Sequence, residues 1–283
     1  MDIDRRRLCA AALLACAGAR GRAAPLPVAP AASGAADGRQ VALVIGNADY
    51  RIGALKNPVN DAQAVAGALK GLGFDVALRE NTTLRDMIEA FRQFSISARS
   101  ARVRVIFYAG HGVQVKGRNY LLPVDTEIRA EDEVAAKSAD VNELLERLGT
   151  MQSGINIVIL DACRNNPFSG ALVLGPDGRR LKFRGATPAG LAPVEAPLGS
   201  MVAFSTAPGG VALDNPADKN SLYTKHLLGY MQSPGLPVEM LFKQVRLAVA
   251  RETGRVQVPW ESSSLTGDFC FRLGPQGNCS IAR

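Results

Sequence analysis

Two stretches decide the fold of this chain: VRVIFYAGHG at residues 103–112 and INIVILDACR at residues 155–164. Each opens with a largely apolar run of strand length, and each ends in a reactive side chain, His111 or Cys163. Nearly continuous apolar runs are typical of strands that are buried on both faces of a parallel sheet. Functional groups of such sheets collect where the strands end at their carboxyl edge. We therefore expect His111 and Cys163 at one edge, in contact if their strands are neighbours.

Strand-like and helix-like segments alternate along most of the chain. Apolar runs typical of strands occupy residues 41–46, 74–78, 103–108, 155–160, 201–205 and 265–271, with an arm of a small hairpin at 120–122. Apolar residues at helical spacing occupy 59–69, 84–94, 141–148, 220–231 and 238–253. This alternation predicts an α/β fold with a mostly parallel sheet of about six strands and helices on both faces.

The composition is that of an ordinary globular protein. The 283 residues are 47% hydrophobic and 21% charged, which excludes a wholly disordered chain. The formal net charge of +7 is spread along the sequence, without a clustered basic face or runs of aromatic residues, so we expect no nucleic-acid partner. Five Cys do not make a disulfide scaffold at this length, and two His leave little material for a metal site.

The first residues look like a targeting signal. Residues 1–19 combine three Arg, a short apolar run and small residues, which predicts a secretory leader cut near Ala19. A lipobox-like stretch before Cys16 leaves lipid anchoring open, and an uncleaved N-terminal anchor is a further alternative. Residues 20–38 are rich in Ala, Pro and Gly and read as a flexible linker. We expect a periplasmic or secreted protein without a transmembrane span.

A Cys beside a His predicts nucleophilic catalysis. The thiolate is the nucleophile, and a nearby imidazole favours the thiolate and later protonates the leaving amine. The backbone N–H groups of Gly112 and Cys163 are candidates for an oxyanion hole. The alternative is that Cys163 is a small buried apolar residue and His111 a turn residue.

The segment Tyr108-Ala109-Gly110-His111-Gly112, followed about 50 residues later by Cys163, resembles the caspase-like cysteine peptidases. Asp161 stands where caspases carry Gln, and Asn165 where they carry Gly. An Asp at the first of these positions is what metacaspases and paracaspases carry, so the chain is more similar to those.

Two more stretches carry the resemblance. ALVIGNADY at residues 42–50, with Leu55 and the Asn60-Asp61-Ala62 segment, resembles the opening strand and first helix of the family, and WESSSLTGDF at 260–269 resembles the closing segment of bacterial members. The resemblance covers residues 40–271. It implies a caspase-like three-layer domain at 39–271, with a large part at 39–163, a loop at 164–199, a small part at 200–271 and a tail at 272–283.

Acidic residues indicate the substrate. Caspases cut after Asp and line the first pocket with Arg, whereas this chain offers Asp161 and, after a Gly-rich turn, Asp214. The resemblance places Asp61 in the same pocket. Carboxylates pair best with a guanidinium or ammonium group, so we expect cleavage after Arg or Lys. The alternatives are an Asp61 that favours a helix dipole and an Asp161 that bonds nearby turn N–H groups.

Three features leave alternatives open. The loop at 164–199 carries Arg179, Arg180, Lys182 and Arg184, which are either self-processing sites or solvated charges. Cys270 and Cys279 either form a disulfide or leave Cys270 as an apolar residue. We expect no required cofactor; calcium dependence stays open, because the acidic residues of 127–132 lack a recognisable calcium-loop spacing.

The sequence therefore predicts an exported cysteine endopeptidase that cuts after Arg or Lys. The alternative is a non-catalytic caspase-like module that binds partner proteins.

Overall fold

The computed structural model describes residues 38–151, 153–163, 173–174, 180–181, 191–208, 210, 212 and 218–279, with the backbone alone at 163, 173–174 and 180–181. These residues belong to one compact unit, Gly34–Arg283. The expected leader at 1–19, with Cys16, lies outside the described residues, as do Asp214 and nearly all of the expected linker at 20–38.

A twisted sheet forms the centre of the domain, with the strand order β10-β9-β6-β3-β1-β2. Neighbouring strands are parallel except at the edge, where β10 runs antiparallel to β9. The bounds are β1 (Gln40–Gly46), β2 (Asp75–Glu80), β3 (Val103–Val115), β6 (Ile155–Cys163), β9 (Ser200–Phe204) and β10 (Trp260–Ser263). The expectation of a mostly parallel sheet is confirmed.

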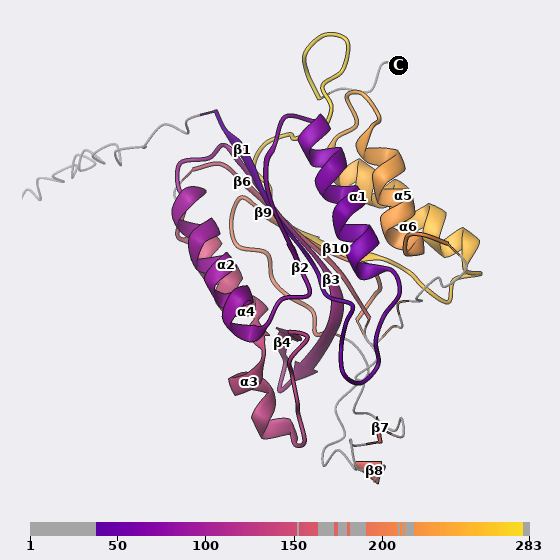
Figure 1. The fold of residues 1–283 in the computed structure, drawn as a ribbon. Coiled ribbons are helices and arrows are strands. Elements are labelled where there is room, and N and C mark those ends of the chain that lie inside the picture. The colour runs from indigo at the N-terminus through magenta and orange to yellow at the C-terminus, as the bar shows by residue number, and fades with distance from the viewer. Residues whose placement is uncertain are drawn as a thin grey trace, which may run out of the picture. The chain divides into compact units, whose positions relative to one another are not determined.

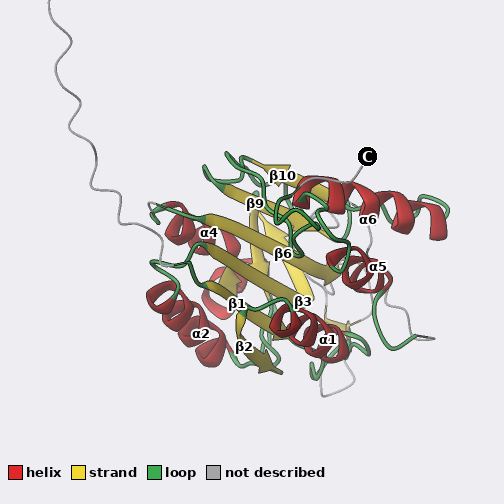
Figure 2. Ribbon diagram, turned by 90° about the horizontal axis from the view of Figure 1, so that it is seen from above, coloured by secondary structure: helices red, strands yellow, loops and turns green. Residues whose placement is uncertain are grey.

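Helices cover both faces of the sheet, as Figures 1 and 2 show. One face carries α1 (Pro58–Gly71), α5 (Leu222–Met231) and α6 (Val238–Glu252). The other carries α2 (Leu84–Ser97) and α4 (Val141–Gly149), while the short η1 (Glu131–Glu133) and α3 (Val134–Lys137) lie beyond the end of the sheet. The three layers confirm the expected fold class.

The two-sided burial explains the apolar strand runs. In β1, Ala42 and Val44 pack into the core under α1, α5 and α6. Their neighbours Leu43 and Ile45 pack into the core under α2 and α4. Because successive side chains of a strand point to opposite faces, both sets must be apolar when both faces are covered.

The strand that carries His111 is longer than the sequence pattern indicated. β3 does not end at Tyr108 but continues to Val115 and pairs antiparallel with β4 (Arg118–Leu121), which in turn pairs with β5 (Ala139–Asp140). The connecting residues Lys116 and Gly117 have φ of 50° and 79°, as a tight hairpin turn requires. His111 therefore lies within a strand, and the expected hairpin arm near residues 120–122 is confirmed.

The expected last strand at 265–271 is wrong, because β10 at Trp260–Ser263 closes the sheet. Residues 265–271 are apolar for another reason: Phe269 and Phe271 are buried in the core beside Phe74, without strand pairing. The mainly polar WESS segment pairs because its backbone, not its side chains, bonds to β9. An exposed edge strand needs no apolar run.

A disulfide joins Cys270 and Cys279, with their Cα atoms 5.5 Å apart. This separation is normal for the bond. It decides between the two alternatives for this pair, although Cys270 is also buried at 4% exposure.

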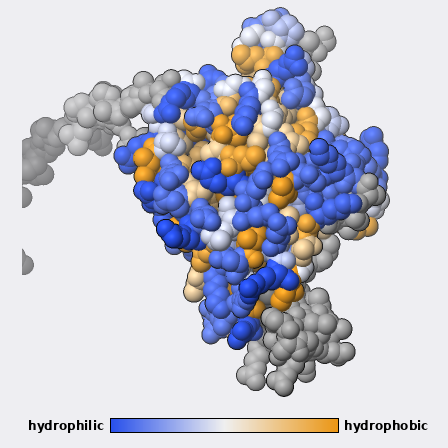
Figure 3. All heavy atoms as spheres, in the orientation of Figure 1, coloured by the Kyte–Doolittle hydropathy of each residue, from blue (hydrophilic) through white to orange (hydrophobic). Residues whose placement is uncertain are grey.

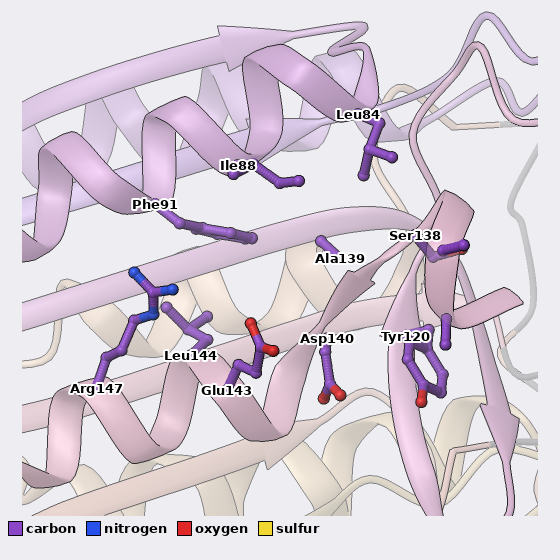
Figure 4. A pocket seen from close by; sticks show the side chains of 12 residues that line it. Leu84, Ile88, Phe91, Tyr120, Ser138, Ala139, Asp140, Glu143, Leu144 and Arg147 are labelled. Carbon is purple, nitrogen blue, oxygen red and sulfur yellow. The ribbon is translucent and has the colours of Figure 1, made fainter.

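In the view of Figure 3, hydrophilic residues predominate on the surface and the apolar groups are small. Within the described ranges, no helix combines the length and the hydrophobicity that crossing a bilayer requires. A cavity of about 330 Å³ opens between α2 and α4, lined by Leu84, Phe91 and Leu144 among others (Figure 4). His111 and Asp161 do not line it, so we do not assign it to the substrate.

Arg104 is a fully buried cation on β3, exposed by only 1%. Its guanidinium donates to the carbonyls of Ala98 and Arg99, at 2.6 and 2.8 Å, just beyond the C-terminus of α2. It also donates to the Ser153 carbonyl and to Asn156 Oδ1. A planar group with several donors therefore joins the end of α2 to the start of β6.

Replacing Arg104 with Met should destabilise the domain by about 3 kcal/mol, because several buried carbonyls lose a charged donor. Arg104→Lys should recover only part of this loss, since an ammonium cannot reproduce the fork of donors. Urea unfolding followed by circular dichroism measures both. Arg102→Met, at an exposed site, is the matched control; equal losses at the two positions would contradict this account.

Candidate active site

The sheet register pairs His111 with Cys163. β3 and β6 are parallel neighbours, and their partners run from Val103–Ile155 to His111–Cys163. The same register sets Ala109 beside Asp161. The two motifs, about 50 residues apart in sequence, therefore meet at one end of the sheet, as the sequence predicted for adjacent strands.

The imidazole of His111 is held in one orientation. The side chain is 8% exposed, and its Nε2 lies 2.6 Å from the carbonyl oxygen of Gly53. A carbonyl only accepts, so Nε2 carries the proton and Nδ1 is the nitrogen that can take up another. The ring of Tyr50 lies against the imidazole, with the centroids 4.4 Å apart.

Two tyrosine hydroxyls hold the backbone around His111. The His111 N–H donates to Tyr50 Oη at 2.9 Å, and Tyr108 Oη donates to the His111 carbonyl at 2.7 Å. The hydroxyls lie 3.1 Å from each other, and both also approach the Leu122 carbonyl. Burial raises the pKa of Tyr108 well above its usual value, so this hydroxyl remains a donor. The network fixes the strand on both sides of the imidazole.

Asn47 extends the same network to the end of β1. Its Nδ2 donates to the Leu122 carbonyl at 3.1 Å, and its Oδ1 accepts from the backbone N–H and hydroxyl of Thr82. Asn81 Oδ1 accepts from the N–H groups of Ala48 and Asp49, which shapes the turn that leads to Tyr50. The Asn-Ala-Asp-Tyr segment is thus the support of His111, a role that the sequence alone did not assign.

Gly110 makes this arrangement possible. Its φ is +152°, and a Cβ there would lie 2.6 Å from Tyr50 Oη and 2.7 Å from Tyr108 Oη. Gly53, with φ +72°, lies beside the ring: a Cβ there would be 3.3 Å from His111 Nε2, a tight contact. At Gly110 a side chain would collide with the two hydroxyls that orient the imidazole, and at Gly53 the positive φ favours glycine.

Two of the three expected pocket carboxylates come together at the start of α5. Asp61, on α1, is 1% exposed, and Asp161, on β6, is 8% exposed. Ser221 binds both: its N–H donates to Asp61 Oδ1 at 3.0 Å, and its hydroxyl donates to Asp161 Oδ2. Thr224 Oγ1 also donates to Asp161, at 2.7 Å. The expected third member, Asp214, lies outside the described residues.

The structure assigns no role to the described oxyanion-hole and processing candidates. Gly112 pairs with Leu121 in the hairpin, and a Cβ there would lie 3.2 Å from Ala162 Cβ, so its part in an oxyanion hole stays a prediction. Of the processing candidates, Arg180 has its backbone in β8 (Arg180–Leu181), which pairs with β7 (Val173–Leu174). Arg179, Lys182 and Arg184 lie outside the described residues.

Acidic residues near position 127 pair with cations. Glu127 forms an ion pair with Arg51, and Glu133 with Lys137 at 2.8 Å. The pKa of Glu133 is lowered, mainly by its hydrogen bond to Lys137. Across the part of the chain that the structure describes, no group of three or more His, Cys, Asp or Glu is arranged to hold a metal ion.

Comparison with known proteins agrees with this fold and shows the family. The family model of the caspase domain, Peptidase_C14, matches residues 39–270. The human mucosa-associated lymphoid tissue lymphoma translocation protein 1 is 30% identical over 128 residues, and so is its mouse homologue. Each match covers 44% of this chain and 15% of the relative. The crystal structure of caspase-1 from Spodoptera frugiperda has a TM-score of 0.61 at 18% identity, covering 90% of this chain and 99% of the other.

The chain therefore belongs to the caspase-domain peptidases of family C14, a family of cysteine peptidases. The insect caspase supports the fold alone, because its sequence identity is low. The match spans only 15% of the length of the two mammalian proteins.

Replacing Tyr50 with Phe should destabilise the domain by about 1–3 kcal/mol, because the buried His111 N–H loses its acceptor. Tyr223→Phe is the matched control: Tyr223 is fully buried, but among the described residues its hydroxyl has no hydrogen-bond partner. Its removal should be neutral or stabilising. Urea unfolding of both variants tests the network, and equal changes would contradict it.

Proposed function

We propose that this chain is an exported cysteine endopeptidase that cuts peptide bonds after Arg or Lys with a His111–Cys163 dyad. One observation carries the proposal: the register of β3 and β6 sets His111 beside Cys163, at the end of β6, where Asp161 is also buried. Membership of a cysteine peptidase family supports the reaction class.

In the proposed reaction, His111 Nδ1 takes the proton of the Cys163 thiol, and the sulfur attacks the scissile carbonyl carbon. The peptide C–N bond breaks as the imidazole returns that proton to the leaving amine, which leaves a thioester. Water then attacks the thioester, with Nδ1 accepting its proton, and the acid product and free thiol are released. The bond from Nε2 to the Gly53 carbonyl supports this division of roles, because it commits the other nitrogen to proton transfer.

The negative charge that develops on the carbonyl oxygen needs donors. We assign this role to the backbone N–H groups of Gly112, within β3, and of Cys163, the last residue of β6. The reaction calls for no cofactor or metal, since the nucleophile, the base and the oxyanion donors all come from the chain.

The specificity follows from charge. Asp61 and Asp161 are buried carboxylates that share a partner, Ser221. A buried anion pair is stabilised by a cation that reaches it, and an Arg or Lys side chain has both the charge and the length. An Asp side chain would add a third negative charge, so the pocket disfavours the substrates of caspases. Asp214 is the proposed third member.

Export fits the bonded Cys270–Cys279 pair, because disulfides persist in oxidising compartments. We therefore propose a periplasmic or secreted protein, with lipid anchoring at Cys16 as the alternative to a cleaved leader. Proteins or peptides with an accessible Arg or Lys are the proposed substrates.

Reporter peptides that end in Arg, Lys or Asp test the function directly. The purified protein should hydrolyse the Arg and Lys peptides, and Cys163→Ala and His111→Ala should each lower kcat/KM at least about 1,000-fold. The control is the Cys270→Ala/Cys279→Ala double variant, which removes two disulfide-bonded sulfurs away from the dyad. It should lose about 2–3 kcal/mol of stability and keep its activity below its melting temperature.

Three results would contradict the proposal. A preference for Asp peptides would overturn the specificity, and full activity of Cys163→Ala would overturn the nucleophile. Hydrolysis of none of the peptides, with the fold intact, would favour the non-catalytic partner-binding module.

An enzyme of this specificity should also process itself. The segment 179–184 carries Arg179, Arg180, Lys182 and Arg184 between Cys163 and β9. We expect prolonged incubation to yield a fragment that begins at Arg180, Leu181, Phe183 or Gly185, read by intact mass. Cys163→Ala should stay whole, and so should a variant with Gln at all four basic positions. Identical masses for the wild type and Cys163→Ala would rule out self-processing here.

A further inference from the structure

The start of α5 contacts two buried carboxylates, one on α1 and one near the end of β6. Asp61 comes from the first turn of α1 and Asp161 from β6, and α1 and α5 lie side by side on the same face of the sheet (Figures 1 and 2). Strand alternation gives the reason for Asp161: Ile157 and Ile159 pack on the α1, α5 and α6 side, and Asp161 continues that series.

Ser221 is the residue that both carboxylates share. Its backbone N–H donates to Asp61 Oδ1, which also accepts from Asn220 Nδ2 at 2.8 Å. Its hydroxyl donates to Asp161 Oδ2 and accepts from the Thr224 N–H at 3.0 Å, as the N-cap of α5. The one hydroxyl proton is therefore committed to Asp161 by the capping bond on the other side of the oxygen.

These hydrogen bonds stabilise two buried carboxylates, Asp61 and Asp161. Ionised carboxylates are costly to bury unless charge-assisted hydrogen bonds satisfy them. The positive end of the α5 dipole adds to the stabilisation of both anions. The charge of Asp161 is felt nearby: after burial itself, it is the largest cause that holds the pKa of Tyr223 well above its usual value.

In sequence, the acceptor carboxylates precede the 164–199 loop and their hydrogen-bond donors follow it. Asp61 and Asp161 precede the loop, whereas Asn220, Ser221 and Thr224 follow it. Each carboxylate is therefore bonded by residues that follow the loop in sequence.

We infer that Ser221 is a positioning residue for substrate specificity, which sets Asp61 and Asp161 as a joint receptor for the cationic side chain of an Arg or Lys substrate. This inference rests on the proposed function. Ser221 acts through the carboxylates and takes no part in proton transfer at His111 or Cys163.

The first test separates binding from chemistry. Ser221→Ala should raise KM for Arg and Lys reporter peptides about 10- to 100-fold, the equivalent of one hydrogen bond to a charged group, and change kcat less than about 3-fold. Ser221→Thr keeps the hydroxyl and should restore KM to near the wild-type value. Thr83→Ala is the matched control, because Thr83 caps α2 in the same way and contacts neither carboxylate. It should lower the melting temperature and leave KM unchanged.

A second variant guards against a folding defect. Thr224→Val removes one donor to Asp161, keeps the side-chain volume and leaves the capping bond from the Thr224 N–H intact. It should also raise KM for Arg peptides. If either variant folds and its KM for Arg peptides is unchanged, the inference is overturned.

Equilibrium binding distinguishes this inference from the proposed function. The probe is a short acetylated peptide ending in arginine amide, titrated by calorimetry into the Cys163→Ala protein, beside a peptide ending in norleucine amide. Tighter binding of the arginine peptide that Ser221→Ala abolishes supports the inference even if the wild type hydrolyses nothing. Equal binding of the two peptides, with or without Ser221, overturns it even if the wild type is an active peptidase.

Discussion

The parallel pairing of β3 with β6 is the constraint on which the site depends. It sets residues that are distant in sequence side by side, with His111 opposite Cys163 and Ala109 opposite Asp161. The backbone bonds of this pairing lie in the core between two helical layers, where Phe107 and Ile159 are fully buried. A slip of one residue would turn every side chain of a strand to the other face, so the buried apolar pattern makes the register of the site costly to change.

Residues that follow β1 orient the imidazole of His111, the proposed base. Tyr50 and Asn47 reach across to the His111 N–H and the Leu122 carbonyl, and the turn that they begin brings the Gly53 carbonyl to Nε2. The imidazole is thus fixed through backbone groups on several sides. The two glycines, Gly53 and Gly110, stand where any side chain would meet this network.

The buried carboxylates Asp61 and Asp161 are hydrogen-bonded by residues that follow the 164–199 loop in sequence. Ser221 and Thr224, at the start of α5, bind carboxylates that precede the loop. In the proposed peptidase, the dyad and the acidic pocket therefore have different supports: tyrosines and glycines near β1 for the base, and α5 for the anions. This separation allows substrate preference to be altered without disturbing the nucleophile and base.

The sequence by itself determined the layered α/β class and most helix bounds, because its apolar residues follow the spacing of buried strands and amphipathic helices. It predicted contact between His111 and Cys163 only for neighbouring strands, and the tertiary structure decided that β3 and β6 are neighbours. The sequence misplaced the last strand: the apolar 265–271 segment is buried without pairing, whereas the mainly polar β10 pairs through its backbone. Only the tertiary structure decided the roles of Tyr50, Gly53 and Ser221. Their function lies in hydrogen bonds to residues far along the chain, and such contacts leave no local pattern in the sequence.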